Sequence, residues 1–138
     1  MIDARPRRIV YWSTTIATAL LFVVPGAALL GGTPHFIDEM SRLGYPVYFR
    51  ALLGVAKLLG AAVILLPRLP RLKEWAYAGL LFDSVSAVVS RTAIGDEPVQ
   101  LLPPILVGAL ALISWQLRPK SRRLARAEFD DAVRQQRA

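Results

Sequence analysis

Four long apolar stretches limit the folds that this chain can adopt. They run over Ile9–Leu30, Pro46–Leu66, Glu74–Ala93 and Leu101–Leu117. A helix rises about 1.5 Å per residue, so each stretch crosses most or all of the roughly 30 Å hydrocarbon core of a bilayer. The short connections between them favour antiparallel neighbours. The sequence therefore predicts an all-α membrane protein, with an antiparallel four-helix transmembrane domain over residues 1–117 and a basic tail over residues 118–138.

Lysines and arginines are concentrated in three of the segments that flank the apolar stretches. The N-terminus, the second connection and the tail carry most of them, and four spans put these three segments on the same side of the membrane. Because segments rich in positive charge stay in the cytoplasm, we expect both termini to be cytoplasmic. A cleaved signal peptide is the alternative for the first stretch, but the apolar run to Leu30 is longer than a usual signal.

The net charge also indicates what the chain binds. In a soluble domain, a formal charge of +7 would suggest a nucleic-acid partner. Here the charge lies between apolar stretches, so we expect anionic lipids as the partner and no nucleic acid. The end of the tail is weakly amphipathic, and it is either a helix that docks a protein partner or a solvated segment. Instead of a different protein, the partner could be a second copy of the chain, in a homo-oligomer.

Residue counts exclude several kinds of chemistry. The chain has no cysteine and a single histidine, His35. Disulfides, thiol redox chemistry and cysteine metal sites are therefore excluded, and a pair of histidine ligands for haem cannot form within one chain. We expect no metal site, no catalytic residue and no enzymatic activity of the chain on its own.

Two ionisable residues, Lys57 and Asp83, each lie alone near the middle of an apolar stretch. An ionised side chain at the centre of a span costs roughly 2.5–3.5 kcal/mol on insertion scales, so such residues usually face a partner or a cavity. Leu66 ends the second stretch and Glu74 starts the third, so both should lie at the same membrane surface. Lys57 precedes Leu66 by the same number of residues as Asp83 follows Glu74. The two charges therefore lie at matching depth, and the same count puts Thr18 in their layer.

Small residues accompany both charges at helical spacing. Gly54 shares a helix face with Lys57. Gly79 shares one with Asp83. Small side chains let helices approach closely in lipid, so the sequence predicts a buried Lys57–Asp83 ion pair, which Thr18 joins through a polar stripe on the first helix. Three interpretations remain open: a pair that fixes helix register, a proton- or ligand-responsive site, or a Lys57 that extends to the membrane surface without pairing.

The outer ends of the spans carry further candidate residues. Arg50 and Arg91 approach the acidic turn at Asp96, which predicts an outer salt bridge and an outward-facing vestibule. In the first outer connection, Thr33-Pro34 is followed by apolar residues on one helical face. This pattern is typical of a short interfacial helix with an N-cap and a proline at its first position.

Several strings in the sequence are specific enough to suggest a family. The strings LGYP, LGVAKLLG and LKEWAYAG, with a last apolar helix that ends in WQLRP, resemble the DoxX-like family of small bacterial membrane proteins. The resemblance runs from about Tyr11 to Pro119. It implies a four-helix bundle in the bacterial cytoplasmic (inner) membrane. Lys57 matches the lysine of the family's LGxxKLLG pattern, and Asp83 matches a frequent acidic position.

The same resemblance marks an inner-side motif. The residues that match the family's EWAYAG pattern are Glu74, Trp75 and Tyr77. Independently of the family, we expect Glu74 to start the third helix as a first-turn acid that interacts favourably with the helix dipole.

The residue counts favour a non-catalytic role, and the resemblance implies the setting in which the chain acts. The founding relatives are membrane subunits of a thiosulfate:quinone oxidoreductase, and others resemble membrane scaffolds for oxidative-stress enzymes. We therefore expect a membrane subunit or scaffold for a redox or stress-response partner. The alternative is a small carrier, or a protein that binds a quinone or another lipophilic molecule through Lys57 and Asp83.

Overall fold

The structure, a computed structural model, describes residues 4–118 and 132–136. Residues 4–118 form five helices: α1 spans Ala4–Gly31, α2 Pro34–Arg42, α3 Val47–Leu65, α4 Pro70–Ala93 and α5 Pro98–Leu117. No strand occurs in the described residues, which confirms the predicted all-α class. Residues 132–136 are also helical, and the rest of the predicted basic tail beyond Arg118 lies outside the described residues.

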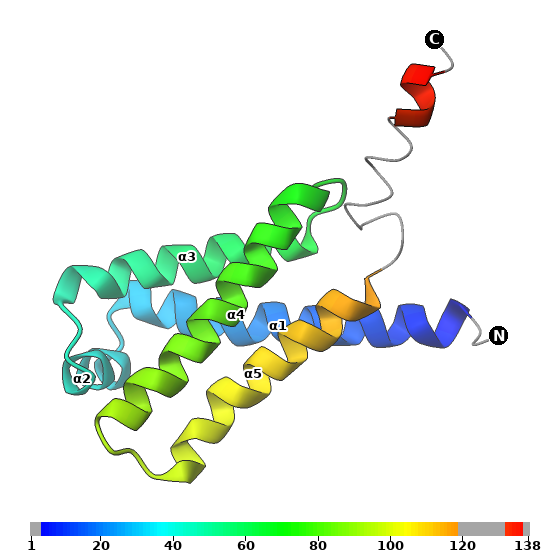
Figure 1. Cartoon of the computed structure of the whole chain (residues 1–138). Helices are drawn as coiled ribbons and strands as arrows, with labels where there is room; N and C mark the ends of the chain where they lie inside the picture. The colour runs from blue at the N-terminus through cyan, green and yellow to red at the C-terminus, as the bar shows by residue number, and fades with distance from the viewer. Residues whose placement is uncertain (1–3, 119–131, 137–138) are drawn as a thin grey trace.

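Four of the helices are long, and each packs against two others. α1 lies against α3 and α5, and α4 lies against the same two helices (Figure 1). The chain reverses between successive long helices, so the N-terminus, the connection at residues 66–69 and the end of α5 lie at one end of the molecule. We call this end the basic end. The opposite end, formed by α2 and the turn at residues 94–97, is the α2 end.

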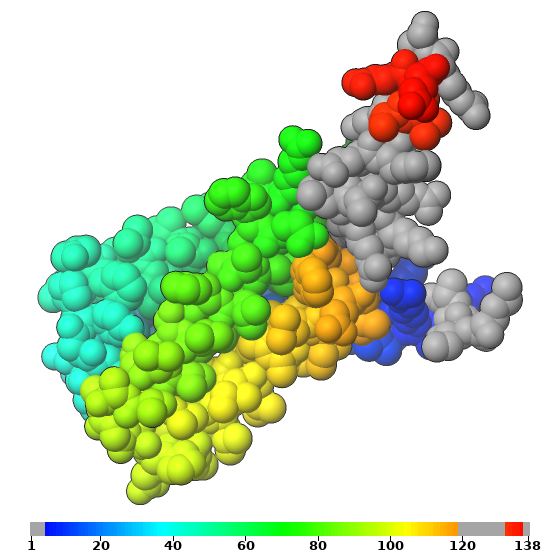
Figure 2. All heavy atoms as spheres, in the orientation of Figure 1, coloured from blue at the N-terminus to red at the C-terminus, as the bar shows by residue number. Residues whose placement is uncertain are grey.

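Three helices, α1, α3 and α5, are long and apolar enough to cross a membrane. α4 is long enough, at 24 residues, but it is less apolar than these three. All four long helices carry large apolar side chains on the outside, among them Val24, Leu59, Phe82 and Leu106. Figure 2 shows the surface of α4 between those of α3 and α5. Lipid is the solvent that suits such a surface, and the chain is a multi-pass membrane protein.

Prolines begin three of the helices. Pro34, Pro70 and Pro98 occupy the first turns of α2, α4 and α5, where a missing N–H costs nothing. The predicted short helix after Thr33 is therefore present as α2. The predicted cap is only partly right, because the Thr33 side chain makes no capping hydrogen bond. Its backbone carbonyl instead accepts hydrogen bonds from the N–H groups of Phe36 and Ile37.

α1 and α3 cross at two glycines. A Cβ atom on Gly54 would lie 2.9 Å from the carbonyl oxygen of Gly26 and 2.9 Å from Cγ of Leu30. A Cβ atom on Gly26 would lie 3.1 Å from Cβ of Lys57. The two backbones approach this closely only because neither residue has a side chain. The crossing fixes Lys57 beside α1.

The buried core lies on the other side of this crossing, towards the basic end. It joins α1, α3 and α4 through Ala19, Phe22, Ala61, Ile64, Tyr77 and Leu80. Lys73, at the start of α4, is buried as well, and its ammonium donates hydrogen bonds to the carbonyl oxygens of Val63 at 2.9 Å and Ile64 at 2.5 Å. These are among the last carbonyls of α3, which have no partner within the helix. The contact ties the two helices together at the basic end.

Candidate ligand-binding site

Lys57 of α3 and Asp83 of α4 lie side by side in the structure. Lys57 Nζ is 2.5 Å from Asp83 Oδ2, and the two side chains are 15% and 19% exposed. The ammonium also lies over the ring of Phe22, 5.0 Å from its centroid, where the electron-rich face attracts a cation. Both charges are therefore compensated where they stand, and each keeps a small accessible area.

Thr18 does not join the pair, in contrast to the prediction. It is buried, and its hydroxyl donates to the carbonyl oxygen of Thr14 one turn earlier, at 2.7 Å. A threonine in a helix readily makes this bond to its own backbone. Phe22, one turn further along α1, is the residue whose ring lies beside the Lys57 ammonium.

A buried hydroxyl cluster, which the sequence did not reveal, joins α1, α4 and α5. Ser114 Oγ lies 2.6 Å from Thr15 Oγ1 and 2.7 Å from the hydroxyl of Tyr77. All three side chains are buried. Ser114 is the one serine or threonine of α5, and a lone hydroxyl in so apolar a helix is the signal that would have pointed to it.

A cavity of about 350 Å³ opens between α3 and α4 and reaches the ion pair. The two helices diverge away from their connection, and α2 covers the open end (Figure 1). Most of the wall is apolar, and the charged lining residues lie in two places: Lys57 and Asp83, and Glu39 and Arg91. The apolar side chains that line it include Leu29, Phe36, Met40, Leu43, Phe49, Leu53 and Phe82.

A second, smaller cavity of about 190 Å³ lies on the other side of the pair. The lining residues that it does not share with the first cavity, Trp75, Ala76 and Leu80, lie nearer the basic end. Lys57 and Asp83 line both cavities. The pair is thus the charged part of the wall that the two apolar cavities share, together with Leu53, Ala56 and Gly79.

The small residues of α4 create this cavity rather than a close helix contact. Gly79, Ser86, Ala87 and Ser90 all line it, and a Cβ atom added to Gly79 would meet nothing within 4 Å. The prediction that the small residues beside Asp83 pack against a neighbouring helix is therefore wrong for Gly79. On α3, Gly54 does pack closely, but against α1 and not against α4.

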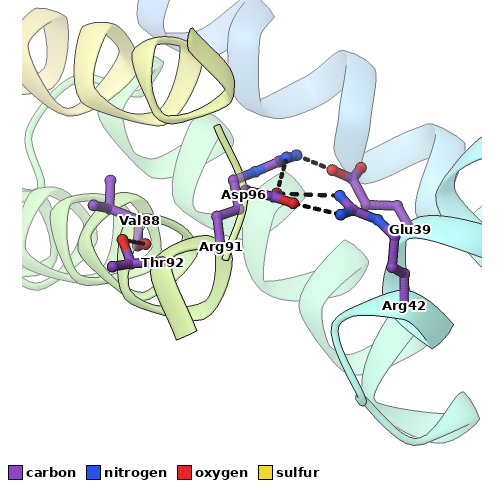
Figure 3. A network of polar contacts seen from close by, with 6 residues as sticks. All are labelled: Glu39, Arg42, Val88, Arg91, Thr92 and Asp96. Atoms are coloured by element: carbon purple, nitrogen blue, oxygen red, sulfur yellow. Dashed lines mark hydrogen bonds and ion pairs between the residues drawn. The ribbon is translucent and has the colours of Figure 1, made fainter. Parts of the chain in front are cut away.

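Ionic contacts link α2 to α4 and the turn after it (Figure 3). Arg42 donates to the Asp96 carboxylate at 2.5 Å and 3.2 Å, and Arg91 donates to it at 3.2 Å. Arg91 also pairs with Glu39 of α2. Hydrogen bonds from Arg42 hold the pKa of Asp96 below its ordinary value, and the carboxylate in turn raises the pKa of Arg42. A salt bridge at Asp96 is present, and it includes Arg42 as well as Arg91.

Arg50 lies apart from this network and outside the lining of the cavity. Its guanidinium donates to the carbonyl oxygen of Leu29, in the last turn of α1. A cation near a helix C-terminus satisfies a free carbonyl and interacts favourably with the helix dipole. The predicted vestibule thus has Arg91 in its wall, whereas Arg50 instead caps α1.

The residues of the inner-side motif take three different positions. Because α4 begins at Pro70, Glu74 lies beyond its first turn and is not the predicted first-turn acid. Its carboxylate accepts hydrogen bonds from Trp115 Nε1 at 2.8 Å and from Arg118 Nη2 at 2.5 Å, and so ties α4 to the end of α5. Tyr77 is buried in the hydroxyl cluster. Trp75 is 82% exposed and points away from the core. The motif is therefore a set of anchors at the basic end, and the structure does not bring its members together.

Apolar helices around a cavity that ends at an ion pair define a class, the multi-pass helical membrane proteins with an internal polar site. More specifically, the chain belongs to the DoxX-like family, whose family model matches residues 13–114. That range holds the ion pair, the cavity and the outer network, and the match confirms the resemblance seen in the sequence. Comparisons with curated proteins and with solved structures found no significant match.

Proposed function

We propose that α4 is a fourth span and that the chain lies in a bacterial inner membrane with both termini in the cytoplasm. The contact between Arg42 and Asp96 supports this, because it joins the turn between α4 and α5 to α2, at the end opposite to the connection between α3 and α4. α4 must then run the full length between neighbours that are apolar enough to span. The basic residues at the other end favour a cytoplasmic location for that end.

The function that the geometry supports best is the binding of a small lipophilic molecule, without catalysis, in the cavity between α3 and α4. The observation that carries this proposal is that the mostly apolar cavity ends at the ion pair of Lys57 and Asp83. Binding sites for small molecules are typically hollows of roughly 300–1,000 Å³, mostly apolar, with a few polar groups that orient the ligand. The cavity has this size and this composition.

A second candidate is the membrane subunit or scaffold role that family membership suggests. The exposed aromatic side chains of Trp75 and Phe82 support it, because they lie on α4 and line the two cavities beside the ion pair. A partner docked there would face the bound molecule directly. Extraction from native membranes tests this role, and the absence of any stoichiometric protein partner in the extract would count against it.

Gly79→Leu is the sharpest test of ligand binding. The new side chain fills the end of the cavity next to the pair, and it has space because a Cβ atom on Gly79 meets nothing within 4 Å. Ala78→Leu is the matched control, because Ala78 is exposed on the same helix and does not line this cavity. Each variant is extracted gently into lipid nanodiscs, and mass spectrometry then identifies the lipophilic molecules that remain bound.

We expect one class of molecule to be enriched with the wild type and with Ala78→Leu and depleted with Gly79→Leu. Equal amounts in all three samples, with all three chains folded, would exclude the cavity as the binding site. Circular dichroism and size-exclusion chromatography establish that each variant keeps its helices and its monodispersity.

A further inference from the structure

We infer that the ligand of this cavity is an electrically neutral amphiphile whose head group both donates and accepts a hydrogen bond, and that the head group lies against Lys57 and Asp83. This inference rests on the proposed binding function and narrows it to one class of molecule. It is carried by the charge balance of the cavity and by the unused hydrogen-bonding capacity of the ion pair.

The charges that line the cavity cancel. Its charged lining residues are Glu39, Lys57, Asp83 and Arg91. Lys57 pairs with Asp83, and Glu39 pairs with Arg91. A carboxylate or an ammonium on the ligand would add a charge with no free counter-charge, inside a wall that is mostly apolar. Placing an unpaired charge in such a setting is strongly unfavourable, so the cavity selects against ionised ligands.

The ion pair still has hydrogen-bonding groups to offer. An ammonium has three N–H donors, and a carboxylate has two acceptor oxygens with about four sites between them. Among the described residues, Lys57 donates to Asp83 Oδ2 alone, and Asp83 Oδ1 accepts no hydrogen bond. A head group with one acceptor and one donor therefore meets a complementary donor and acceptor side by side, without separating the pair.

The polar groups nearer the α2 end offer less. Arg91 divides its guanidinium between Asp96 and Glu39. The hydroxyls of Tyr45 and Ser90, which also line the cavity, bond to each other at 2.5 Å. The wall between these groups and the pair includes apolar side chains such as Leu53 and Phe82. These differences favour a ligand with its head group at Lys57 and Asp83 and its apolar tail towards α2.

Matched photoreactive probes test this inference directly. Four probes share one decyl tail with a diazirine and differ in the head group: a primary amide, a carboxylate, an ammonium, or no head group at all. Each is added to the full chain in nanodiscs of neutral lipid at neutral pH and is photolysed. Mass spectrometry then measures the labelling of the peptide that carries Leu53 and of the peptide that carries Phe82. Division by the labelling of Gly79→Leu corrects for the different partitioning of the probes into lipid.

We expect the amide, which donates and accepts, to label the wild type roughly tenfold more than either charged probe or the probe without a head group. Two variants then change the charge of the site. Asp83→Asn leaves Lys57 unpaired and should shift the preference to the carboxylate. Lys57→Gln leaves Asp83 unpaired and should shift it to the ammonium. If either variant fails to fold, the ranking of the four probes on the wild type decides alone.

The possible outcomes separate the inference from the function on which it rests. If no probe labels the wild type above Gly79→Leu, the cavity binds none of these amphiphiles and the proposed function itself fails. If a charged probe or the probe without a head group labels the wild type best, the binding function stands but the neutral, hydrogen-bonding ligand is wrong.

Discussion

A charge is costly in an apolar helix interface because it lacks a counter-charge, and Lys57 and Asp83 supply one to each other. Their distance of 2.5 Å and the Phe22 ring beside the ammonium compensate both charges. Removing one partner leaves the other charge with little water and no counter-ion, whereas removing both leaves only a change of shape.

We expect Lys57→Met and Asp83→Asn each to lower the free energy of unfolding by about 3 kcal/mol, the lower end of the range for broken buried pairs, because both side chains keep some accessible area. The double variant should recover part of this loss. Unfolding in detergent, followed by circular dichroism, measures all three proteins. Strictly additive losses would mean that the two side chains act independently.

The lowered pKa of Asp96 makes the stability of the α2 end depend on pH. Its pKa is held below the ordinary value of about 3.9, mainly by hydrogen bonds from Arg42. A carboxyl whose pKa is lower in the folded state stabilises the fold fully at pH above its unfolded pKa, and this contribution disappears as the pH falls through the folded pKa. The network that joins α2 to the turn at residues 94–97 should therefore weaken below about pH 4 and stay intact at neutral pH.

The measurement is the thermal unfolding midpoint as a function of pH. Asp96→Asn should have a lower midpoint at neutral pH and a smaller drop below about pH 4 than the wild type. Asp38→Asn removes a carboxylate from α2 that, among the described residues, forms no hydrogen bond or ion pair with the arginines of the network, and it serves as the control. An identical acid response in Asp96→Asn and the wild type would assign the effect to other groups.

The contacts of single residues were predictable from the sequence only where depth in the membrane, counted along the helix, decided which side chains meet. Counting along the helices correctly put Lys57 and Asp83 in one layer, because rise per residue is fixed. It failed for Thr18, because Gly26 and Phe22 are the residues of α1 that lie beside Lys57. Thr18 lies one turn beyond Phe22, and its hydroxyl bonds to its own helix backbone. It also missed Ser114, since the direction of a side chain around the helix axis depends on how the helices rotate against each other.

At the scale of helices, two glycines with similar sequence surroundings have opposite roles. Gly54 sits where the backbones of α1 and α3 touch, and Gly79 borders empty space between α3 and α4. We expect Gly54→Ala to lower the free energy of unfolding by about 1–3 kcal/mol, because its Cβ meets the backbone of Gly26. Gly79→Ala should be neutral, or stabilising by up to about 1 kcal/mol, because alanine is the better helix former.

Equilibrium unfolding of the two single variants in the same detergent compares them directly. A loss for Gly79→Ala as large as that for Gly54→Ala would contradict the presence of free space at Gly79. The pair also explains why the small-residue pattern predicted too much. The pattern shows where a close approach is permitted, whereas the divergence of α3 and α4 decides that none occurs at Gly79.

At the scale of the whole molecule, orientation in the membrane is the property that most needs a direct measurement. The chain has no cysteine, so single cysteines report location without background. Ser41→Cys lies on α2, and Arg5→Cys lies near the N-terminus at the basic end. We expect a membrane-impermeant maleimide to label Ser41→Cys in intact cells or spheroplasts, and to label Arg5→Cys only after permeabilisation. The reverse pattern would invert the proposed topology.

The helices themselves were largely predictable, and the cavity was not. Apolar stretches, proline starts and short connections specify helix limits locally, and the four long helices begin and end within a few residues of the predicted spans, except where α1, α4 and α5 extend further at their starts. The predicted vestibule gave no volume and wrongly included Arg50. The cavity depends on the angle between α3 and α4 and on the position of α2. Both are determined by the packing of all the helices.

The compensation of the Lys57–Asp83 pair has an electrical consequence. A lone charge that moves across the membrane field exchanges about 2.3 kcal/mol with it for every 100 mV. The pair carries no net charge, and its ammonium and carboxylate lie only 2.5 Å apart. The membrane potential therefore changes the energy of the pair very little. A neutral molecule that bonds to both groups leaves this unchanged. Occupancy of the cavity should therefore be the same in an energised cell and in a depolarised one.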